Sequence, residues 1–501
     1  MAELIPCPLA AQARQHPTAT AIYARSADGS TRLTLSYAAF DRQVTQVAAD
    51  LAALPPGQVL LVAADNGLPL LTLIWAALRC GVVLCPVNPR WPAGRLSELA
   101  RQLGAAALWL PDSTRAAPEL ADLPCPVLAL PALQRSLAEL VTMPSTAVHH
   151  APLPSLDPQA LANLTLTSGS TGAPKAVAHR LRAHLANARG SATRLPLQPG
   201  DGWLLSLPLW HVGGYAIAMR CVLAGASVVL PDPALDLASW LRQAPITHLS
   251  LVPTQLWRLL AAGLRFSETR LQHLLLGGAP IPATLVAACQ AQGLQPWVSS
   301  GLSEMASQVC TGRADADHDA VGHPLPGRDL RLLAGEIQVR GETLFAGYYQ
   351  GDGRLDLPLT ADGWLATGDL GHWHPDHGLT IVGRRDNRFI CGGENIQPEI
   401  IEQQLIQHPQ ISQALVVPVA DAEWGMRPVA LIAATPGASM DPLPALADWL
   451  RTRGPGYLIP RCALPWQHTM TDGLKPSRKL LAEWATRQLA ATPSAGVKTA
   501  V

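Results

Sequence analysis

One segment of the chain holds the residue types that phosphate binding requires. Residues 165–175 read TLTSGSTGAPK and follow an apolar run of strand length. Hydroxyl side chains and two glycines give a loop whose backbone amides can turn toward phosphate oxygens, and Lys175 adds a positive charge. The pattern differs from the GxxxxGKS/T loop, because Ala173 and Pro174 separate the second glycine from the lysine. The segment predicts a phosphate-binding loop, with an ordinary polar turn as the alternative.

The elements around this loop read as an α/β fold. From about residue 58 to 300, apolar runs of strand length alternate with helix-length segments. One expected strand ends at Asp65, and others lie near residues 84, 108, 165, 205, 229, 250 and 275. Pro253 and Gly263 mark the start and the end of one expected helix. This alternation is typical of doubly wound, mostly parallel sheets.

The pattern changes after residue 320 to short alternating strands with glycine-rich turns, which predicts a small β unit ending near Gly383. A helix over Gln397–Gln407, two strands and a helix over Leu446–Arg451 follow. We therefore expect a large N-terminal domain over residues 1–385 and a smaller, mobile α+β domain over residues 386–501.

Composition and charge exclude several classes of protein. The 501 residues are 48% hydrophobic and 15% charged, and 37 Lys and Arg balance 37 Asp and Glu, so no broad cationic face is available for nucleic acid. Residues 271–303 lack charge but are broken by proline and glycine, and the N-terminus does not read as a signal peptide. The nine scattered cysteines favour reduced thiols. A cytoplasmic protein without an integral membrane segment is expected.

The whole string TLTSGSTGAPK matches the signature loop of the adenylate-forming superfamily, which contains acyl-CoA synthetases, peptide-synthetase adenylation domains and luciferases. Four further segments resemble the family's motifs in order and spacing, so the resemblance covers most of the chain. It implies activation of a carboxylic acid by magnesium and ATP, then transfer to coenzyme A. By this resemblance the outgoing phosphates are held by Lys175 together with Thr167, Ser168, Gly169, Ser170, Thr171 and Gly172.

The segment SSGLSE resembles the family's aromatic-Gly-x-Thr-Glu motif. The resemblance gives Glu304 the role of holding magnesium and Ser303 a phosphate contact, and it places Ser300 and Gly301 among the nucleotide-binding residues. Ser300 stands where the family has the aromatic residue that faces adenine. The adenine is therefore held more loosely, or Trp297 replaces the missing ring.

Three later motifs complete the resemblance. WLATGD places Asp369 at the ribose hydroxyls, and GRRDNRF places Arg384 there too, with Asp386 as the hinge of the small domain. Alone, Asp369 reads as a turn residue and Arg384 as a solvated charge. In DGLKPSRKLL, Lys475 best matches the lysine that neutralises charge on the α-phosphate, and Lys479 is the competing alignment.

Within the superfamily, residues 161–328 look most like the o-succinylbenzoate-CoA ligases of menaquinone biosynthesis. Such an acid has a second carboxylate, and Arg220 is the only charged side chain between Asp201 and Asp232. Since a buried arginine needs an anionic partner, Arg220 either serves that carboxylate or forms a structural ion pair. The remaining expected acyl-pocket residues are His211, Gly277, Gly278 and Ala279.

The alternatives for these residues stay open. His211 can be a satisfied core histidine, and Gly277 with Gly278 can form a simple tight turn. A different aryl or fatty acid, a carrier protein as acceptor, or a ligand-binding protein that lost catalysis would fit the same motifs. The oligomeric state is not predicted.

Overall fold

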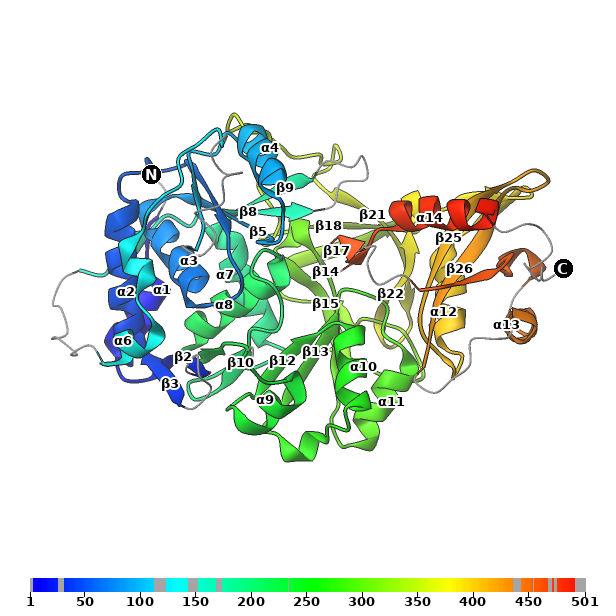
Figure 1. Cartoon of the computed structure of the whole chain (residues 1–501), viewed down its shortest axis with the longest axis horizontal. Coiled ribbons are helices and arrows are strands. Elements are labelled where there is room, and N and C mark those ends of the chain that lie inside the picture. Colours follow the sequence, from blue (N-terminus) through cyan, green and yellow to red (C-terminus); the bar gives the residue numbers. More distant parts are fainter. Residues whose placement is uncertain are drawn as a thin grey trace.

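The computed structural model describes residues 3–25, 31–111, 123–142, 152–167, 174–232, 234–435, 443–453, 455–466, 471–472 and 475–491. Helices and sheets alternate in layers over the N-terminal part, and the elements after residue 385 gather at one end of the long axis (Figure 1). The predicted α/β class is confirmed.

The first large sheet positions the phosphate-loop segment. Its strands, in spatial order, are β20 (Leu355–Asp356), β19 (Gly347–Tyr349), β9 (Lys175–Arg180), β8 (Leu161–Thr167), β5 (Val83–Val87), β4 (Val59–Ala63) and β6 (Ala107–Trp109). The strands β8, β5, β4 and β6 run parallel, whereas β8 and β9 form an antiparallel hairpin.

The second large sheet carries the segments that end at Gly277 and lead to Glu304. Its order is β16 (His323–Pro324), β15 (Ser307–Arg313), β14 (Trp297–Leu302), β13 (His273–Gly277), β12 (His248–Leu251), β10 (Gly202–Leu204), β11 (Ser227–Val229), β2 (Thr20–Arg25) and β3 (Arg32–Ser36). The run from β14 to β2 is parallel. Parallel strands place their carboxyl ends at one edge, where ligands of α/β proteins bind.

Both sheets are buried on two faces, as alternate residues of β4 show. Leu60 and Val62 pack into the core between the sheets, while Val59 and Leu61 pack against the outer helix. The helices between the sheets are α1 (Pro8–Gln15), α2 (Tyr37–Leu51), α3 (Leu68–Cys80), α7 (Leu181–Ala192) and α8 (Val212–Ala224). The outer helices are α4 (Ala93–Leu103), α9 (Leu237–Gln243), α10 (Pro253–Ala261) and α11 (Ala283–Ala291). The short helix α6 (Leu137–Thr142) contacts α2 and β3.

Local signals set the boundaries of these helices. α10 begins at Pro253, and the chain leaves it through Gly263 at φ +72°, as the sequence predicts. The N–H of Ala39 donates to the Ser36 hydroxyl at the start of α2.

The small β unit lies between the large sheets and the C-terminal part. It consists of β17 (Arg328–Leu333), β18 (Glu336–Gly341), β21 (Leu365–His374) and β22 (Gly378–Arg384), all antiparallel. Its last strand ends one residue after the predicted Gly383.

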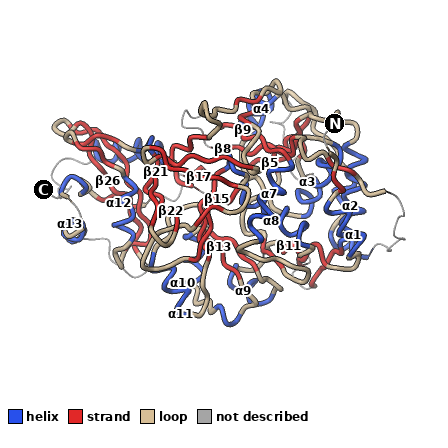
Figure 2. Tube along the Cα trace, turned by 180° about the vertical axis from the view of Figure 1, so that it is seen from behind, coloured by secondary structure: helices blue, strands red, loops and turns tan. Residues whose placement is uncertain are grey.

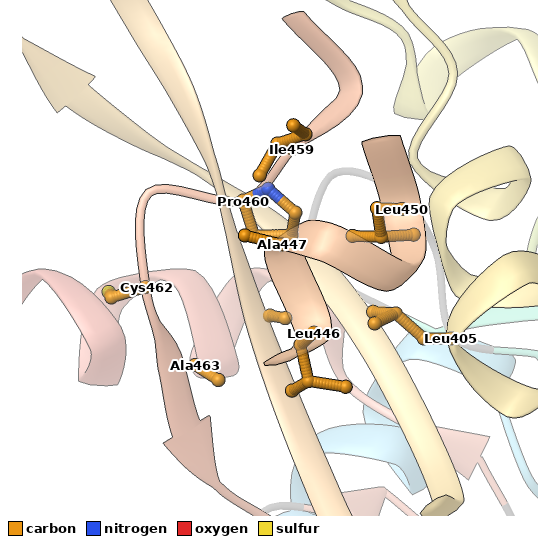
Figure 3. Close-up of a pocket in the computed structure, with 9 residues that line it drawn as sticks. Leu405, Leu446, Ala447, Leu450, Ile459, Pro460, Cys462 and Ala463 are labelled. Atoms are coloured by element: carbon orange, nitrogen blue, oxygen red, sulfur yellow. The ribbon is translucent and has the colours of Figure 1, made fainter. Parts of the chain in front are cut away.

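The C-terminal part has its own sheet and its own apolar core (Figure 2). Its elements are η5 (Arg385–Asn387), β23 (Phe389–Cys391), β24 (Glu394–Ile396), α12 (Pro398–Ile406), β25 (Ile411–Asp421), β26 (Gly425–Ala434), α13 (Leu443–Arg451), β27 (Ala463–Pro465), β28 (Thr471–Asp472), β29 (Lys475–Pro476) and α14 (Arg478–Ala491). A small pocket between α12, α13 and β27 is lined by apolar side chains and Cys462 (Figure 3). It offers no charged group to a nucleotide.

Two further features of the fold concern membrane-spanning helices and disulfides. None of the helices in the described ranges is long and apolar enough to cross a membrane. All nine cysteines are described, and none of them forms a disulfide.

Candidate active site

The β8–β9 hairpin holds the two ends of the predicted phosphate loop. Thr167 and Lys175 face each other as the last cross-strand pair, and the Thr167 hydroxyl donates to the Lys175 carbonyl at 3.5 Å. The predicted residues Ser168, Gly169, Ser170, Thr171 and Gly172 lie outside the described residues. The hairpin therefore fixes where the loop starts and ends.

A tyrosine that the motifs did not identify joins Lys175 to Glu304. The Tyr348 hydroxyl donates to Glu304 Oε1 at 2.9 Å, and Lys175 Nζ lies 4.8 Å from the centre of the Tyr348 ring. Burial, reinforced by the Glu304 charge, raises the pKa of Tyr348, so its hydroxyl remains a donor. Tyr348 thus contacts both a carboxylate and an ammonium group, and carboxylate oxygens are the ligands that Mg²⁺ takes in proteins.

A buried histidine fixes the turn that carries Glu304. Ser303 and Glu304 begin the short helix η4 (Ser303–Met305), and His179 Nε2 donates to the Ser303 carbonyl at 2.7 Å. Burial lowers the pKa of His179 to about 4, so the ring is neutral at pH 7. β9 therefore carries Lys175 and also tethers the turn that holds Glu304.

Ser300 and Gly301 lie at a bulge where β14 meets β15. A Cβ at Gly301 would lie 2.5 Å from the Ser307 carbonyl oxygen, so this position requires glycine. Trp297 is 8% exposed, and the Arg313 guanidinium lies 3.8 Å from its ring centre. The expectation that Trp297 replaces the missing aromatic is wrong, because its ring is packed in the core three residues before Ser300.

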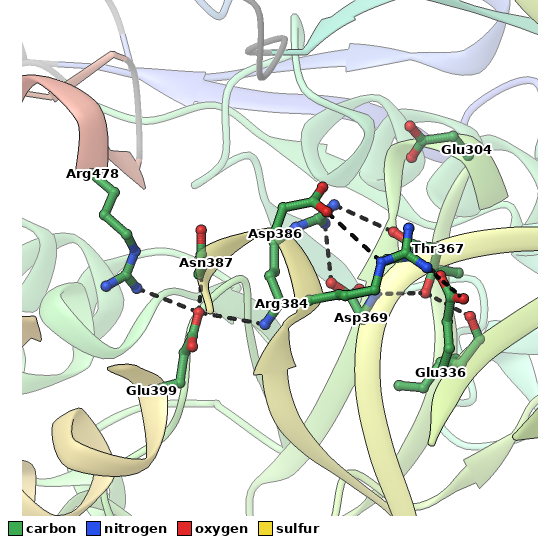
Figure 4. Close-up of polar contacts among 12 residues, drawn as sticks. Glu304, Glu336, Thr367, Asp369, Arg384, Asp386, Asn387, Glu399 and Arg478 are labelled. Carbon is green, nitrogen blue, oxygen red and sulfur yellow. Dashed lines mark hydrogen bonds and ion pairs between the residues drawn. The ribbon is translucent and has the colours of Figure 1, made fainter. Parts of the chain in front are cut away.

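Asp369 and Arg384 meet, as the two ribose-contact motifs require. They are directly opposite in the β21–β22 pair, and Arg384 Nη1 lies 3.0 Å from Asp369 Oδ1 (Figure 4). Arg384 Nη2 also donates to the Thr367 carbonyl at 3.3 Å. Gly368 has φ +75°, and a Cβ there would lie 3.1 Å from Arg384 Nη2. The pair is a specific contact on an exposed strand end.

The chain around Asp386 is tied on both sides. Arg385 Nη1 donates to Glu336 Oε2 at 2.9 Å on the β unit, and its Nε lies 3.8 Å from Asp386 Oδ1. On the other side, Arg478 of α14 lies 3.5 Å from Glu399 Oε1 of α12, which also accepts from Asn387 (Figure 4). Asp386 itself is exposed within η5.

Arg220 is buried without an ionic partner in the part of the chain that the structure describes. Its Nη2 donates to Asn187 Oδ1 at 3.0 Å, and its guanidinium lies 5.3 Å from the Trp203 ring centre. Burial, reinforced by the charge of Arg328, lowers the pKa of Arg220 to about 9. The Nε of Arg220 is buried and has no hydrogen-bond partner among the described residues. The structural ion pair expected as the alternative is absent from these ranges.

The other acyl-pocket residues lie at strand and helix ends. His211 is the half-buried residue before α8. β13 ends at Gly277, where a Cβ would lie 3.0 Å from the Ser299 carbonyl oxygen, and Gly278 has φ +82°. Gly278 and Ala279 are exposed. A side chain at Gly277 would therefore press against the neighbouring strand.

The two candidate lysines of the C-terminal part differ in position. Lys475 lies in β29 and pairs with Asp472, and its side chain is outside the described residues. Lys479 is exposed in the first turn of α14. Arg478 and Leu481, which follow Lys475 at the spacing that the resembling family shows, are both packed. Arg478 Nη1 lies 2.5 Å from Glu402 Oε1, and Leu481 is in the apolar core.

Comparison with known proteins assigns the chain to a family. Residues 9–349 match the AMP-binding enzyme family, and residues 400–465 match the AMP-binding enzyme C-terminal domain. The chain is 40% identical over 458 residues to a 2-succinylbenzoate–CoA ligase of Salmonella typhimurium, covering 90% of this chain and 92% of that protein. It is also 40% identical over 422 residues to the Escherichia coli enzyme of the same name, covering 84% and 86%.

Solved structures of similar proteins share the fold. A variant of Escherichia coli MenE with bound OSB-AMS superposes with a TM-score of 0.81 at 34% identity, covering 96% of this chain and 98% of that one. MenE of Bacillus subtilis in complex with ATP and magnesium superposes with a TM-score of 0.77 at 25% identity, covering 92% and 96%. The predicted resemblance to adenylate-forming enzymes is confirmed, and the chain belongs to the AMP-binding enzyme family.

Proposed function

We propose that the chain is an AMP-forming acid–CoA ligase whose acid is 2-succinylbenzoate. A carboxylate oxygen attacks the α-phosphorus of ATP and pyrophosphate leaves. The thiol of coenzyme A then loses its proton and attacks the acyl carbon, and AMP leaves. The relatives named 2-succinylbenzoate–CoA ligase, which share 40% identity over most of the chain, support this reaction.

The observation that carries the proposal is the grouping around Glu304. One carboxylate, one ammonium and the ends of a hydroxyl-rich loop meet at the edge of a sheet. In this proposal Lys175 and the loop residues bind the outgoing phosphates, Ser303 contacts phosphate, and Glu304 holds magnesium. Magnesium supplies charge neutralisation at the phosphates when bound, and the chain supplies position.

Asp369, Arg384 and Asp386 are the proposed ribose contacts and the proposed hinge. Asp369 accepts hydrogen bonds from the ribose hydroxyls, and Arg384, 3.0 Å away, keeps that carboxylate oriented. Asp386 is the hinge, with domains over residues 1–385 and 386–501. The gap between the two matched family regions, from residue 349 to 400, supports a boundary there.

Lys475 is the proposed adenylation lysine. Its ammonium neutralises charge on the α-phosphate and then withdraws when the small domain turns. The packing of Arg478 against α12 and of Leu481 in the core supports an alignment in which Lys475 precedes α14.

For the acid, Arg220 is the proposed partner of the non-reacting carboxylate. A buried guanidinium with no ionic partner among the described residues is suited to receive an anion. His211, Gly277, Gly278 and Ala279 border the proposed acyl pocket, where small residues leave room. We also propose that the enzyme works in the cytoplasm, in menaquinone biosynthesis; nine unpaired thiols fit a reducing compartment.

A panel of acids tests the proposal. Purified protein with MgATP should release pyrophosphate with 2-succinylbenzoate and should form AMP and a thioester only when coenzyme A is added. Faster turnover with a fatty acid or with benzoate would refute the assignment of the acid. Pyrophosphate release without any CoA-dependent step would indicate a carrier protein as acceptor, and no release with any acid would refute the ligase.

A further inference from the structure

We infer that Tyr348 is a positioning residue that couples the magnesium-binding carboxylate to the phosphate-binding lysine. The inference rests on the proposed function, since it assigns magnesium to Glu304 and phosphate to Lys175. Tyr348 touches both groups: its hydroxyl donates to Glu304 Oε1 at 2.9 Å, and its ring faces Lys175 Nζ at 4.8 Å.

The backbone holds Tyr348 at the junction of the two elements that it joins. Tyr348 pairs with Val177 in the antiparallel β19–β9 contact, which ties it to the strand that begins at Lys175. Three residues earlier, the Phe345 N–H donates to the Glu304 carbonyl at 2.8 Å. The backbone of this segment is therefore hydrogen-bonded both to the strand that begins at Lys175 and to Glu304, independently of the Tyr348 side chain.

Packing fixes the ring. Phe345 is buried, and its ring meets the Tyr348 ring edge-on with centroids 5.0 Å apart. Tyr348 packs with the cluster that contains Met305, the residue after Glu304. A ring held in this way presents its hydroxyl in one direction, toward Glu304.

The chemistry assigns one oxygen of Glu304 to the tyrosine. A hydroxyl donor on Oε1 restricts rotation of the carboxylate, so the group meets the cation in a single orientation. The electron-rich face of the ring attracts the ammonium of Lys175 and limits the space that it explores. Tyr348 thus orders two charged groups of opposite sign that would otherwise be free to pair with each other.

The test separates the hydroxyl from the ring and uses binding as its readout. The dissociation constant of ATP is measured by calorimetry with Mg²⁺ and with EDTA. In Tyr348→Phe, the strengthening of ATP binding by Mg²⁺ should fall about tenfold, at the lower end of a hydrogen bond to a charged group, while binding in EDTA stays unchanged. Tyr348→Leu, which also removes the ring, should weaken ATP binding in EDTA as well.

The matched control is Tyr349→Phe. Tyr349 is the neighbour on β19 and packs with the cluster on the outer face of its sheet, so its change should leave both constants unaltered. Melting temperatures of all variants exclude misfolding. A double-mutant cycle with Glu304→Gln decides the mechanism: the effect of Tyr348→Phe should disappear in that background, because Tyr348 acts through Glu304.

An unchanged magnesium effect in Tyr348→Phe, or an equal loss with and without Glu304, would overturn the inference. Failure of the proposed function is recognised separately, because wild-type protein would then neither bind MgATP nor release pyrophosphate with any acid.

Discussion

The proposed role of Arg220 gives a prediction about which acid the enzyme loses first. Arg220→Lys keeps one positive charge but removes the planar fork that can hold a carboxylate through two hydrogen bonds. We expect turnover of 2-succinylbenzoate to fall sharply. Benzoate has no second carboxylate, so its slow turnover should change little.

The size of the effect follows from the burial of Arg220. Burial lowers the pKa of Arg220 to about 9, because removing the charged guanidinium from water has a free-energy cost. A bound carboxylate offsets part of this cost, and a hydrogen bond to a charged group contributes about 1.5–3 kcal/mol. We therefore expect kcat/KM for 2-succinylbenzoate to fall about 10–100-fold, and that for benzoate by less than about threefold.

The assay is pyrophosphate release at saturating MgATP with each acid in turn. Arg79→Lys is the matched control, because the Arg79 side chain is also only 5% exposed but is paired with Asp41. It should affect both acids alike. Equal losses for the two acids in Arg220→Lys would refute the reasoning and leave Arg220 with a structural role.

Three further predictions concern the lysines, the pH dependence of stability and the C-terminal part. Lys475→Ala should slow adenylate formation about 10²–10³-fold but leave the conversion of supplied acyl-adenylate with coenzyme A intact. Lys479→Ala should leave both half-reactions unchanged, and the reverse result for the two variants would show that the alignment is wrong. The pKa of His179 is about 4 in the folded protein and about 6.5 in the unfolded chain, so the unfolded chain binds a proton first as the pH falls. The free energy of unfolding should therefore decrease by up to ~3 kcal/mol between pH 6.5 and pH 4. A constant free energy of unfolding over that range, measured with urea, would contradict this. Arg478→Met removes the cation that pairs with two buried carboxylates of α12, and it should lower the free energy of unfolding by ~3–5 kcal/mol in the same assay. The control Arg487→Met, at an exposed position of α14, should leave the free energy of unfolding almost unchanged. Equal effects of the two variants would mean that the ion pairs with α12 do not stabilise the fold.

The parts of the fold that could be predicted from sequence are those set by neighbouring residues. Pro253 and Gly263 bound α10 because proline fits the first helical turn and glycine reaches φ +72° at little cost. The apolar run before Thr167 predicts β8 because both faces of that strand are covered. Such signals act over a few residues and need no knowledge of the partner element.

The parts of the site that escaped prediction depend on partners far away in the chain. Tyr348 meets Glu304 across 44 positions, and His179 meets Ser303 across 124. No pattern of spacing encodes these contacts, although the aromatic pair after Gly347 was a visible sign. Trp297 shows that closeness in sequence does not ensure closeness in space. It lies three positions before Ser300, but its ring packs against the Arg313 guanidinium.

The helix α7 connects the proposed acid pocket to the proposed phosphate site. Asn187 Oδ1 accepts a hydrogen bond from Arg220 Nη2 at 3.0 Å, and Asn187 Nδ2 donates to the Gln308 carbonyl at 3.5 Å. Gln308 in turn is the cross-strand partner of Gly301, in the segment that leads to Glu304. A buried polar group without a hydrogen-bond partner lowers stability, so no residue of this hydrogen-bond series can move without leaving another unsatisfied. The proposed acid-binding Arg220 and the strand that pairs with the segment leading to the proposed magnesium ligand Glu304 therefore both contact Asn187, and changes at Asn187 should alter recognition of the acid and of the nucleotide together.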